Sequence, residues 1–165
     1  MQLTWFRRLC LLGALLALCV VVLGAWTRLG NAGLGCPDWP GCYGHLTVGQ
    51  AVQHADEANA AFPDRPLEAD KAIKEMVHRY FASTLGLLII AVAVLAFRNR
   101  HAVSQPLRLP ALLVLLVVFQ GLLGMWTVTL LLKPLIVTAH LAGGLTTMSL
   151  LWWLSLDAGR TGRPE

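Results

Sequence analysis

The chain has 165 residues, of which 56% are hydrophobic and 13% are charged, and its formal net charge is +4. Soluble domains carry about 25% charged residues, so this composition argues against an ordinary soluble protein. The positive charge forms no basic cluster along the chain, which argues against a nucleic-acid partner.

Four uncharged runs dominate the sequence, at residues 9–26, 80–97, 109–132 and 134–156. Each is close to or above the ~18 residues that suggest a membrane-spanning helix. We therefore predict an all-α integral membrane protein, a single four-helix bundle over residues 1–165. Its spans are placed near residues 9–26, 77–97, 109–132 and 134–156, with a long outer loop at 27–76. The first run is longer than the apolar core of a signal peptide and no Ala-x-Ala site follows it, so we expect a retained helix.

Charged residues are divided unevenly between the two sides of this bundle. Seven basic and two acidic residues precede the first span, lie between the second and third, or follow the fourth. The long loop with its extension to Arg79, together with Lys133, holds six basic and seven acidic residues. By the positive-inside rule, both termini are predicted to be cytoplasmic and the long loop to lie outside. The expected location is the cell membrane (an inner or plasma membrane), with the lipid bilayer as a partner.

The long outer loop has three parts. Residues 28–49 are rich in Gly, Pro and Trp and predict a compact irregular structure, whereas residues 50–61 are rich in Ala and predict a short surface helix. A helix-favouring stretch begins at Leu67 and continues into the second span without a breaker. We therefore expect this helix to begin outside the bilayer, with Pro66 in its first turn.

The four cysteines are of two kinds. Cys10 and Cys19 lie within the first span, where thiols usually behave as small apolar residues. Cys36 and Cys42 flank five residues that include two prolines and a glycine, a tight loop that could bring the sulfurs together. The outer compartment permits disulfides. A structural disulfide and a redox-active pair both remain open from the sequence.

Two histidines fall at matching depths in the predicted bundle. His78 lies near the outer end of the second span and His140 near the outer end of the fourth. Cofactor sites in bundles are built from side chains on facing helices, and an ionisable residue at membrane depth indicates function. A haem ligated by one imidazole from each side would fit this pair. The alternative is two unrelated histidines with local hydrogen-bond partners.

Three charged residues lie close to these histidines. Glu75 precedes His78 by one helical turn, so it is either a catalytic carboxylate above the bound group or a solvated acid paired with Lys71. Arg28 and Arg79 lie near the same boundary and could bind carboxylates of a cofactor or reach lipid phosphates instead.

A short repeat hints at internal duplication. The first span ends in Gly24-Ala-Trp-Thr and the third contains Gly124-Met-Trp-Thr, and in each case the next helix carries its histidine near its outer start. This pattern suggests two helical hairpins related by a pseudo-twofold axis along the membrane normal, each supplying one ligand.

The same residues carry a family resemblance. The segments 24–42, 75–79, 120–128 and 138–143 resemble, in order, the first half of the haem A synthases. These membrane enzymes oxidise the C8 methyl group of haem O to the formyl group of haem A. The resemblance implies that His78 and His140 are the axial ligands of haem iron, that Glu75 is the catalytic carboxylate and that Cys36 and Cys42 form the loop disulfide. It implies haem O as substrate and haem A as product, with haem B as another ligand.

Family members usually have eight helices in two similar halves, and the resemblance covers only the first. The chain is thus expected to be a compact form that homodimerises, a piece that needs a second four-helix half, or a haem protein without the reaction. Expected partners are that second copy or half and haem O synthase. The alternative function is an electron-transfer cytochrome with two histidine ligands and no ring chemistry, which would not need Glu75.

Overall fold

The computed structural model describes residues 2–101 and 105–160, and its regular elements are helices. Four of them are long: α1 (Gln2–Leu29), α4 (Ala69–Arg98), α5 (Arg108–Thr129) and α6 (Pro134–Arg160). Each is long and apolar enough to cross a membrane. Among the described residues, the only bridge of β type is isolated, between Cys42 and His45. The predicted all-helical fold with four candidate spans is confirmed, whereas the orientation of the termini stays a prediction.

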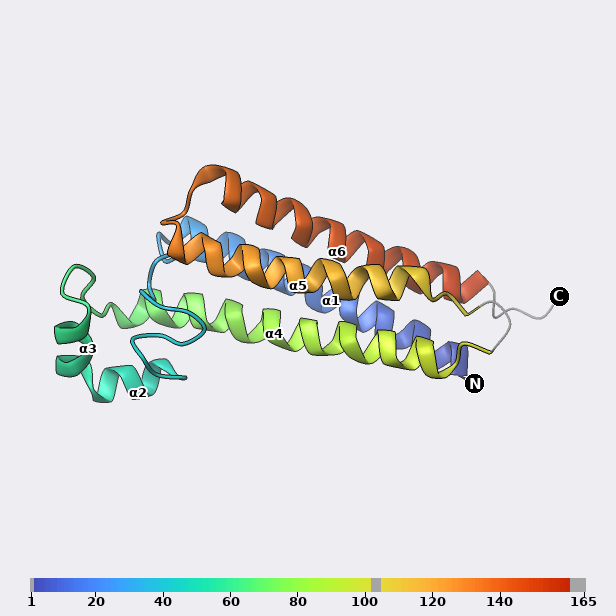
Figure 1. Ribbon diagram of the computed structural model, residues 1–165, viewed down its shortest axis with the longest axis horizontal. Helices are drawn as coiled ribbons and strands as arrows, with labels where there is room; N and C mark the ends of the chain where they lie inside the picture. Colours follow the sequence, from blue (N-terminus) through green and yellow to red (C-terminus); the bar gives the residue numbers. More distant parts are fainter. Residues whose placement is uncertain (1, 102–104, 161–165) are drawn as a thin grey trace.

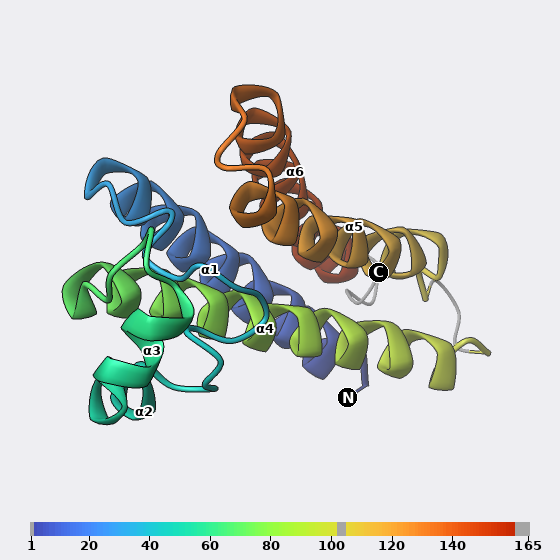
Figure 2. The same cartoon turned by 60° about the vertical axis from the view of Figure 1, so that its left-hand side comes forward.

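The four long helices form a ring in the order α1, α4, α5, α6. Helix α1 packs against α4 and α6, and α5 packs against the same two helices. Figures 1 and 2 show the pair α1–α4 and the pair α5–α6 close together where α1 begins and α6 ends. Figure 2 shows the two pairs diverging toward the opposite end, which carries the short helices α2 (Val48–Gln53) and α3 (Ala55–Ala61).

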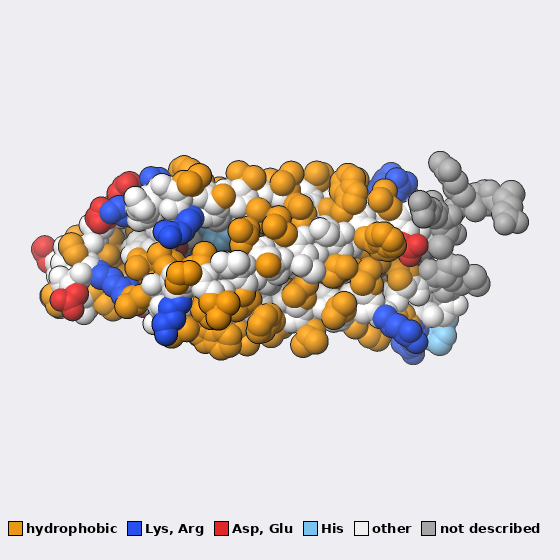
Figure 3. Space-filling model, turned by 90° about the horizontal axis from the view of Figure 1, so that it is seen from above, with side chains coloured by type: hydrophobic (Ala, Val, Ile, Leu, Met, Phe, Trp, Pro, Cys, Tyr) orange, Lys and Arg blue, Asp and Glu red, His pale blue; other side chains and the backbone are white. Residues whose placement is uncertain are grey.

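The end of the bundle where α1 begins is the better packed one. Its core draws side chains from all four long helices: Phe6, Cys10, Ala14, Ala17, Leu85, Ile89, Val92, Ala96, Leu113, Leu151 and Leu154. Cys10 is buried in this core, as expected of a small apolar residue, while Cys19 is exposed on α1. Figure 3 shows hydrophobic side chains along the length of the bundle and charged ones gathered toward its two ends. That distribution is what a bilayer around the middle of the bundle requires.

Residues 30–68, here called the cap, fold over the N-terminal end of α4. Their core contains the cystine and small apolar side chains, and it includes two α4 residues: Cys36, Cys42, Tyr43, Val48, Ala51, Ala58, Ala72 and Met76. The Tyr43 hydroxyl donates to the carbonyl oxygens of Arg65 (3.0 Å) and Pro66 (3.1 Å). Burial, aided by the nearby Glu68 carboxylate, raises the pKa of this hydroxyl, so it stays protonated as a donor.

The cap contains two short helices where the sequence predicts one. The backbone of His54 leaves the helical region, with φ −115° and ψ 38°, and it separates α2 from α3. Thr47 caps α2 by accepting a hydrogen bond from the Gln50 amide. The Ala-rich composition indicated helix correctly but carried no sign of this break.

Helix α4 runs without interruption for 30 residues, as its sequence predicts. Pro66, however, does not lie in its first turn, so that prediction is wrong. The residue before the helix is Glu68, and the Leu67 amide is held by the side chain of Asn59 at 2.8 Å. The backbone of Glu68 is extended, with φ −105° and ψ 97°.

Helix α5 ends at Thr129, three residues before the expected end of the third span. Leu131 and Leu132 both adopt positive φ, 53° and 56°, which turns the chain toward α6. Uncharged leucines extend the apolar run past the helix end, so composition alone could not locate this turn.

The topology can be tested by labelling with a membrane-impermeant maleimide. Glu57→Cys on α3 should be labelled in intact cells, and His101→Cys after α4 only once the membrane is permeabilised, because the inner loops carry the excess of arginine. The unmodified chain, with free Cys10 and Cys19, sets the background. The reverse labelling pattern would place both termini outside.

Candidate functional site

The structure brings His78 of α4 and His140 of α6 together at the diverging end of the bundle. Their ring centroids are 6.4 Å apart and the ring planes are nearly perpendicular, at 80°. One histidine therefore comes from each helical pair, and their role as iron ligands stays a prediction.

His78 is held by the C-terminal half of α1. Its Nδ1 lies 3.1 Å from the carbonyl oxygen of Val20. One turn later Gly24 faces the ring, where a Cβ atom would come within 3.0 Å of Cε1. The missing side chain lets the imidazole approach the helix backbone. With Nδ1 donating to the carbonyl, Nε2 has its lone pair available for a ligand.

His140 repeats this arrangement against α5. A Cβ atom on Gly124 would come within 3.4 Å of its Cε1, and the Gln120 backbone lies beside the ring, as Val20 does for His78. The His140 Nδ1 atom is buried without a hydrogen bond of ordinary geometry to any described residue. In each helical pair, the glycine of the Gly-x-Trp-Thr segment thus lets a histidine ring approach the neighbouring helix. This repetition supports the predicted pseudo-twofold relation.

The donor set favours haem over a bare metal ion. The described residues contain no group of three or more His, Cys, Asp or Glu side chains that could hold a metal. A tetrahedral ion would therefore lack protein ligands here. Haem iron needs only axial ligands from the protein, because the macrocycle supplies the others. Two imidazoles that approach each other beside glycines fit that requirement.

Glu75 is buried beneath the cap, with its side chain 6% exposed. The Cys36 amide donates to Oε2 at 3.0 Å, and the Arg79 guanidinium donates to Oε1. Lys71 instead pairs with Glu68 at 2.7 Å. The interpretation of Glu75 as a solvated acid paired with Lys71 is therefore wrong. Its role as a catalytic carboxylate stays a prediction.

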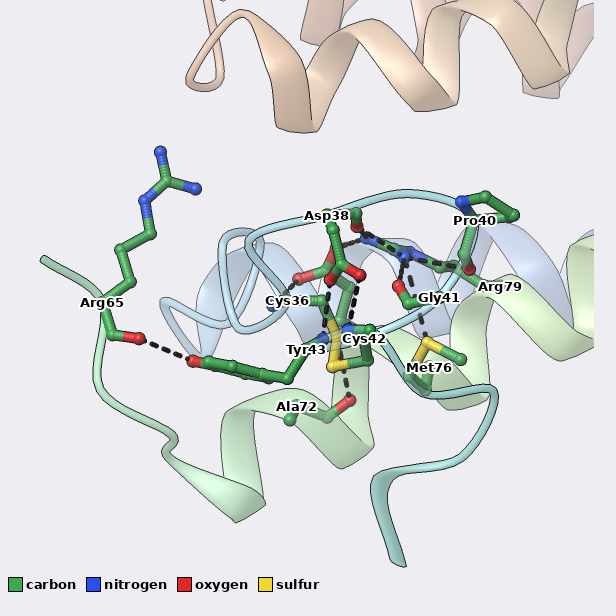
Figure 4. The surroundings of a disulfide bond; sticks show 12 residues. Cys36, Asp38, Pro40, Gly41, Cys42, Tyr43, Arg65, Ala72, Met76 and Arg79 are labelled. Carbon is green, nitrogen blue, oxygen red and sulfur yellow. Dashed lines mark hydrogen bonds and ion pairs between the residues drawn. A yellow bond between two sulfur atoms is a disulfide. The ribbon is translucent and has the colours of Figure 1, made fainter. Parts of the chain in front are cut away.

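The Arg79 guanidinium faces the disulfide loop, residues 36–42. It donates to the carbonyl oxygens of Asp38 (3.1 Å) and Gly41 (2.6 Å) as well as to Glu75. Figure 4 shows this side chain beneath the loop, with the Cys36–Cys42 disulfide beside it. The structure thus pairs the two loop cysteines, as the sequence predicts, and directs Arg79 to protein groups.

Arg28, the other arginine of the predicted site, is exposed in the last turn of α1. Lys74 lies on α4 one turn above His78, with its ammonium 5.6 Å from the centre of the Trp26 ring and 3.8 Å from Asp70. Basic groups from α1 and α4 therefore lie on the cap side of the histidine pair.

Sequence reasoning missed the close approaches that hold the cap in place. Gly35 lies so near α4 that a Cβ atom would be 2.6 Å from the Lys71 carbonyl carbon. The Thr27 hydroxyl bonds the α4 backbone at Lys74, 3.2 Å away. The repeated Gly-x-Trp-Thr could have singled out Gly24 and Gly124, but no comparable signal marks Gly35 among the loop glycines.

Comparison with known proteins agrees with this architecture. The family model COX15-CtaA, described as cytochrome oxidase assembly protein, matches residues 7–164. The chain belongs to this family. No solved structure matches it.

Curated relatives carry the name heme A synthase. One from Shewanella oneidensis is 49% identical over 156 residues, which cover 94% of this chain and 46% of the relative. Another, from Halalkalibacterium halodurans, is 28% identical over 165 residues, covering 96% of this chain and 50% of the relative. The resemblance to haem A synthases is confirmed, and the chain spans about half the length of these relatives.

The approach of Gly35 to α4 predicts a sharp steric effect. Gly35→Ala should destabilise the cap by about 1–3 kcal/mol, because the added methyl group meets helix backbone that cannot move aside cheaply. Gly49→Ala is the matched control, since its Cβ atom would meet no described atom within 4 Å. Thermal unfolding of the detergent-solubilised protein compares the two. Equal midpoints would show that the cap does not pack on α4 in this way.

Proposed function

We propose that the protein is a haem A synthase-like membrane oxidoreductase that acts on the C8 methyl group of haem O and yields the formyl group of haem A. The observation that supports this most directly is the histidine pair, one imidazole from each helical pair and each facing a glycine. Membership of the COX15-CtaA family and the names of the relatives support the choice of substrate.

In this proposal His78 and His140 hold the haem iron as axial ligands. The Val20 carbonyl orients the His78 ring and keeps Nε2 available, the usual task of a backbone acceptor behind a ligating imidazole. Haem supplies the redox chemistry of its iron and, in haem O, the methyl group that is oxidised. The exposed Arg28 at the end of α1 binds a haem carboxylate, a pairing that suits guanidinium geometry.

Glu75 acts on the reacting group. A carboxylate can stabilise positive charge that develops at a substrate carbon or can transfer protons there. Its position one helical turn from His78 on α4 supports this role. The Cys36 amide and Arg79 fix the carboxylate, so it is pre-oriented for this task.

The complete enzyme contains a second four-helix unit, which is another copy of this chain or a second four-helix half. The support is length, because each relative is about twice as long as the part that matches. This unit accepts the electrons removed from the substrate, and haem O synthase supplies that substrate. The assembly lies in the cell membrane with both termini of this chain in the cytoplasm.

Haem extraction from the detergent-purified protein tests the binding site. The wild type should carry haem O or haem A when produced with a haem O supply, and His78→Ala and His140→Ala should lose the bound haem and its absorption spectrum. If the wild-type protein carries no haem, the two histidines are not haem ligands and have structural roles only.

Replacing the carboxylate tests the reaction separately. Glu75→Gln should keep its haem but convert haem O about 10²–10⁴-fold more slowly, the usual contribution of a general acid or base. Chromatography of extracted haems measures the product. Haem B alone in the wild type, with a spectrum unchanged by Glu75→Gln, would favour an electron-transfer cytochrome instead.

The glycine that faces His78 offers a finer test. Gly24→Ala should weaken haem binding about 10–100-fold, as losses of groups that orient metal ligands do, because the methyl group displaces the imidazole from Val20. Gly121→Ala on α5 is the control, with open space at its Cβ position. Haem titration followed by absorption measures both affinities, and equal values would contradict the close approach of α1 to His78.

A further inference from the structure

Arg79 binds five groups with one guanidinium. Its Nη1 donates to the carbonyl oxygens of Asp38, Pro40 and Gly41 at 3.1, 3.3 and 2.6 Å, and lies 3.9 Å from the sulfur of Met76. Its Nη2 donates to Glu75 Oε1 and to the Asp38 carbonyl at 3.2 Å. The side chain is 13% exposed. Figure 4 shows these bonds converging from the disulfide loop onto α4.

The same loop also reaches Glu75 directly. The Cys36 amide bonds Oε2, while Arg79 bonds Oε1 and the carbonyls at the far side of the loop. The Cys36–Cys42 disulfide joins the two ends of this loop. One carboxylate oxygen therefore bonds the loop directly, and the other bonds it through Arg79.

We propose that Arg79 is a positioning residue that, together with the disulfide loop, sets the orientation of the Glu75 carboxylate. This proposal rests on the proposed function for the meaning of Glu75. It differs from the expectation that Arg79 binds a carboxylate of the cofactor. Both Nη atoms already bind protein acceptors, and a haem carboxylate would have to displace them.

The chemistry of arginine suits this task. A planar guanidinium presents its donors in a fixed fork, so it can hold a carboxylate and several carbonyls in one geometry, whereas a lysine ammonium is a compact point charge. The negative charge of Glu75 offsets the positive charge of Arg79 where both are buried. Removing Arg79 would leave the carboxylate without that partner and release the far side of the loop.

The first experiment needs no catalysis. The purified 165-residue chain in detergent is treated with a water-soluble phosphine. Reduction of Cys36–Cys42 is followed by mass spectrometry of the peptide that contains both cysteines. Arg79→Gln should speed reduction about tenfold or more, because the loop loses charge-assisted bonds that resist local opening. Arg65→Gln is the matched control, since Figure 4 shows the Arg65 guanidinium pointing away from the disulfide.

Coupling to Glu75 is tested in the same assay. Glu75→Gln should also speed reduction of the disulfide. In the double variant, the increase in reduction rate should be smaller than the product of the two single increases, because both substitutions act through one set of bonds. Independent, multiplying effects would overturn the coupling. A reduction rate for Arg79→Gln equal to that of Arg65→Gln would overturn the clamp itself.

Kinetics with haem O separates positioning from substrate binding. Arg79→Lys and Arg79→Gln should lower kcat about tenfold or more, with lysine recovering part of the loss, while KM and haem affinity stay within twofold of the wild type. In the Glu75→Gln background, Arg79→Gln should lower kcat no further.

A tenfold loss of haem affinity in Arg79→Gln would make Arg79 a substrate ligand and overturn the proposal. If the wild type converts no haem O, the proposed function fails, whereas the reduction rates still decide whether Arg79 holds Glu75 and the loop.

Discussion

A carboxylate buried at the point where α4 leaves the bundle constrains everything around it. Glu75 has little access to water, and an isolated ionised carboxylate there would be costly. Breaking a buried ion pair by removing one partner costs about 3–5 kcal/mol. Arg79 and the loop amide are therefore needed to keep the carboxylate buried. Arg79 in turn needs acceptors, and the loop carbonyls supply them. The cap thus supplies the partners that allow this charged pair to stay buried.

The two ends of the bundle do different work. The end where α1 begins is closed by Phe6, Leu113, Leu151 and their neighbours, which fix the four helices against one another. Toward the cap the pairs α1–α4 and α5–α6 diverge, and the side chains between them change from large and aliphatic to glycine and histidine. Rigid packing at one end thus leaves the other free to present polar groups. Catalytic and binding groups are usually placed in this way, on elements that a scaffold holds elsewhere.

Sequence reasoning reached most of the fold because membrane helices are specified by composition. Four long apolar runs and the unbroken helix from the cap into the second span could be predicted, as could the pairing of Cys36 with Cys42 in a short loop. The site was predicted less completely. Helical spacing placed Glu75 near His78, but it could not distinguish Lys71 from Arg79 as its partner, since both lie one turn away. That choice depends on the loop, whose carbonyls come from residues about 40 positions earlier. The turn at Leu131–Leu132 could not be predicted either, because an apolar sequence gives no sign of its positive φ angles.

The pseudo-twofold arrangement bears on what half-length means. Gly24 faces His78 and Gly124 faces His140, so the two helical pairs contribute equivalent halves of one site within this chain. The pair of imidazoles is thus formed inside a four-helix unit and needs no residue from a second unit. What departs from the symmetry is the cap, which sits on α4 and has only a short turn as its counterpart between α5 and α6. Glu75 and Arg79 lie under that cap. The proposed chemistry therefore takes place on the α4 side of a nearly symmetric pair of histidines. Under the proposed function, a second four-helix unit would accept electrons from the site and would not need to supply either histidine.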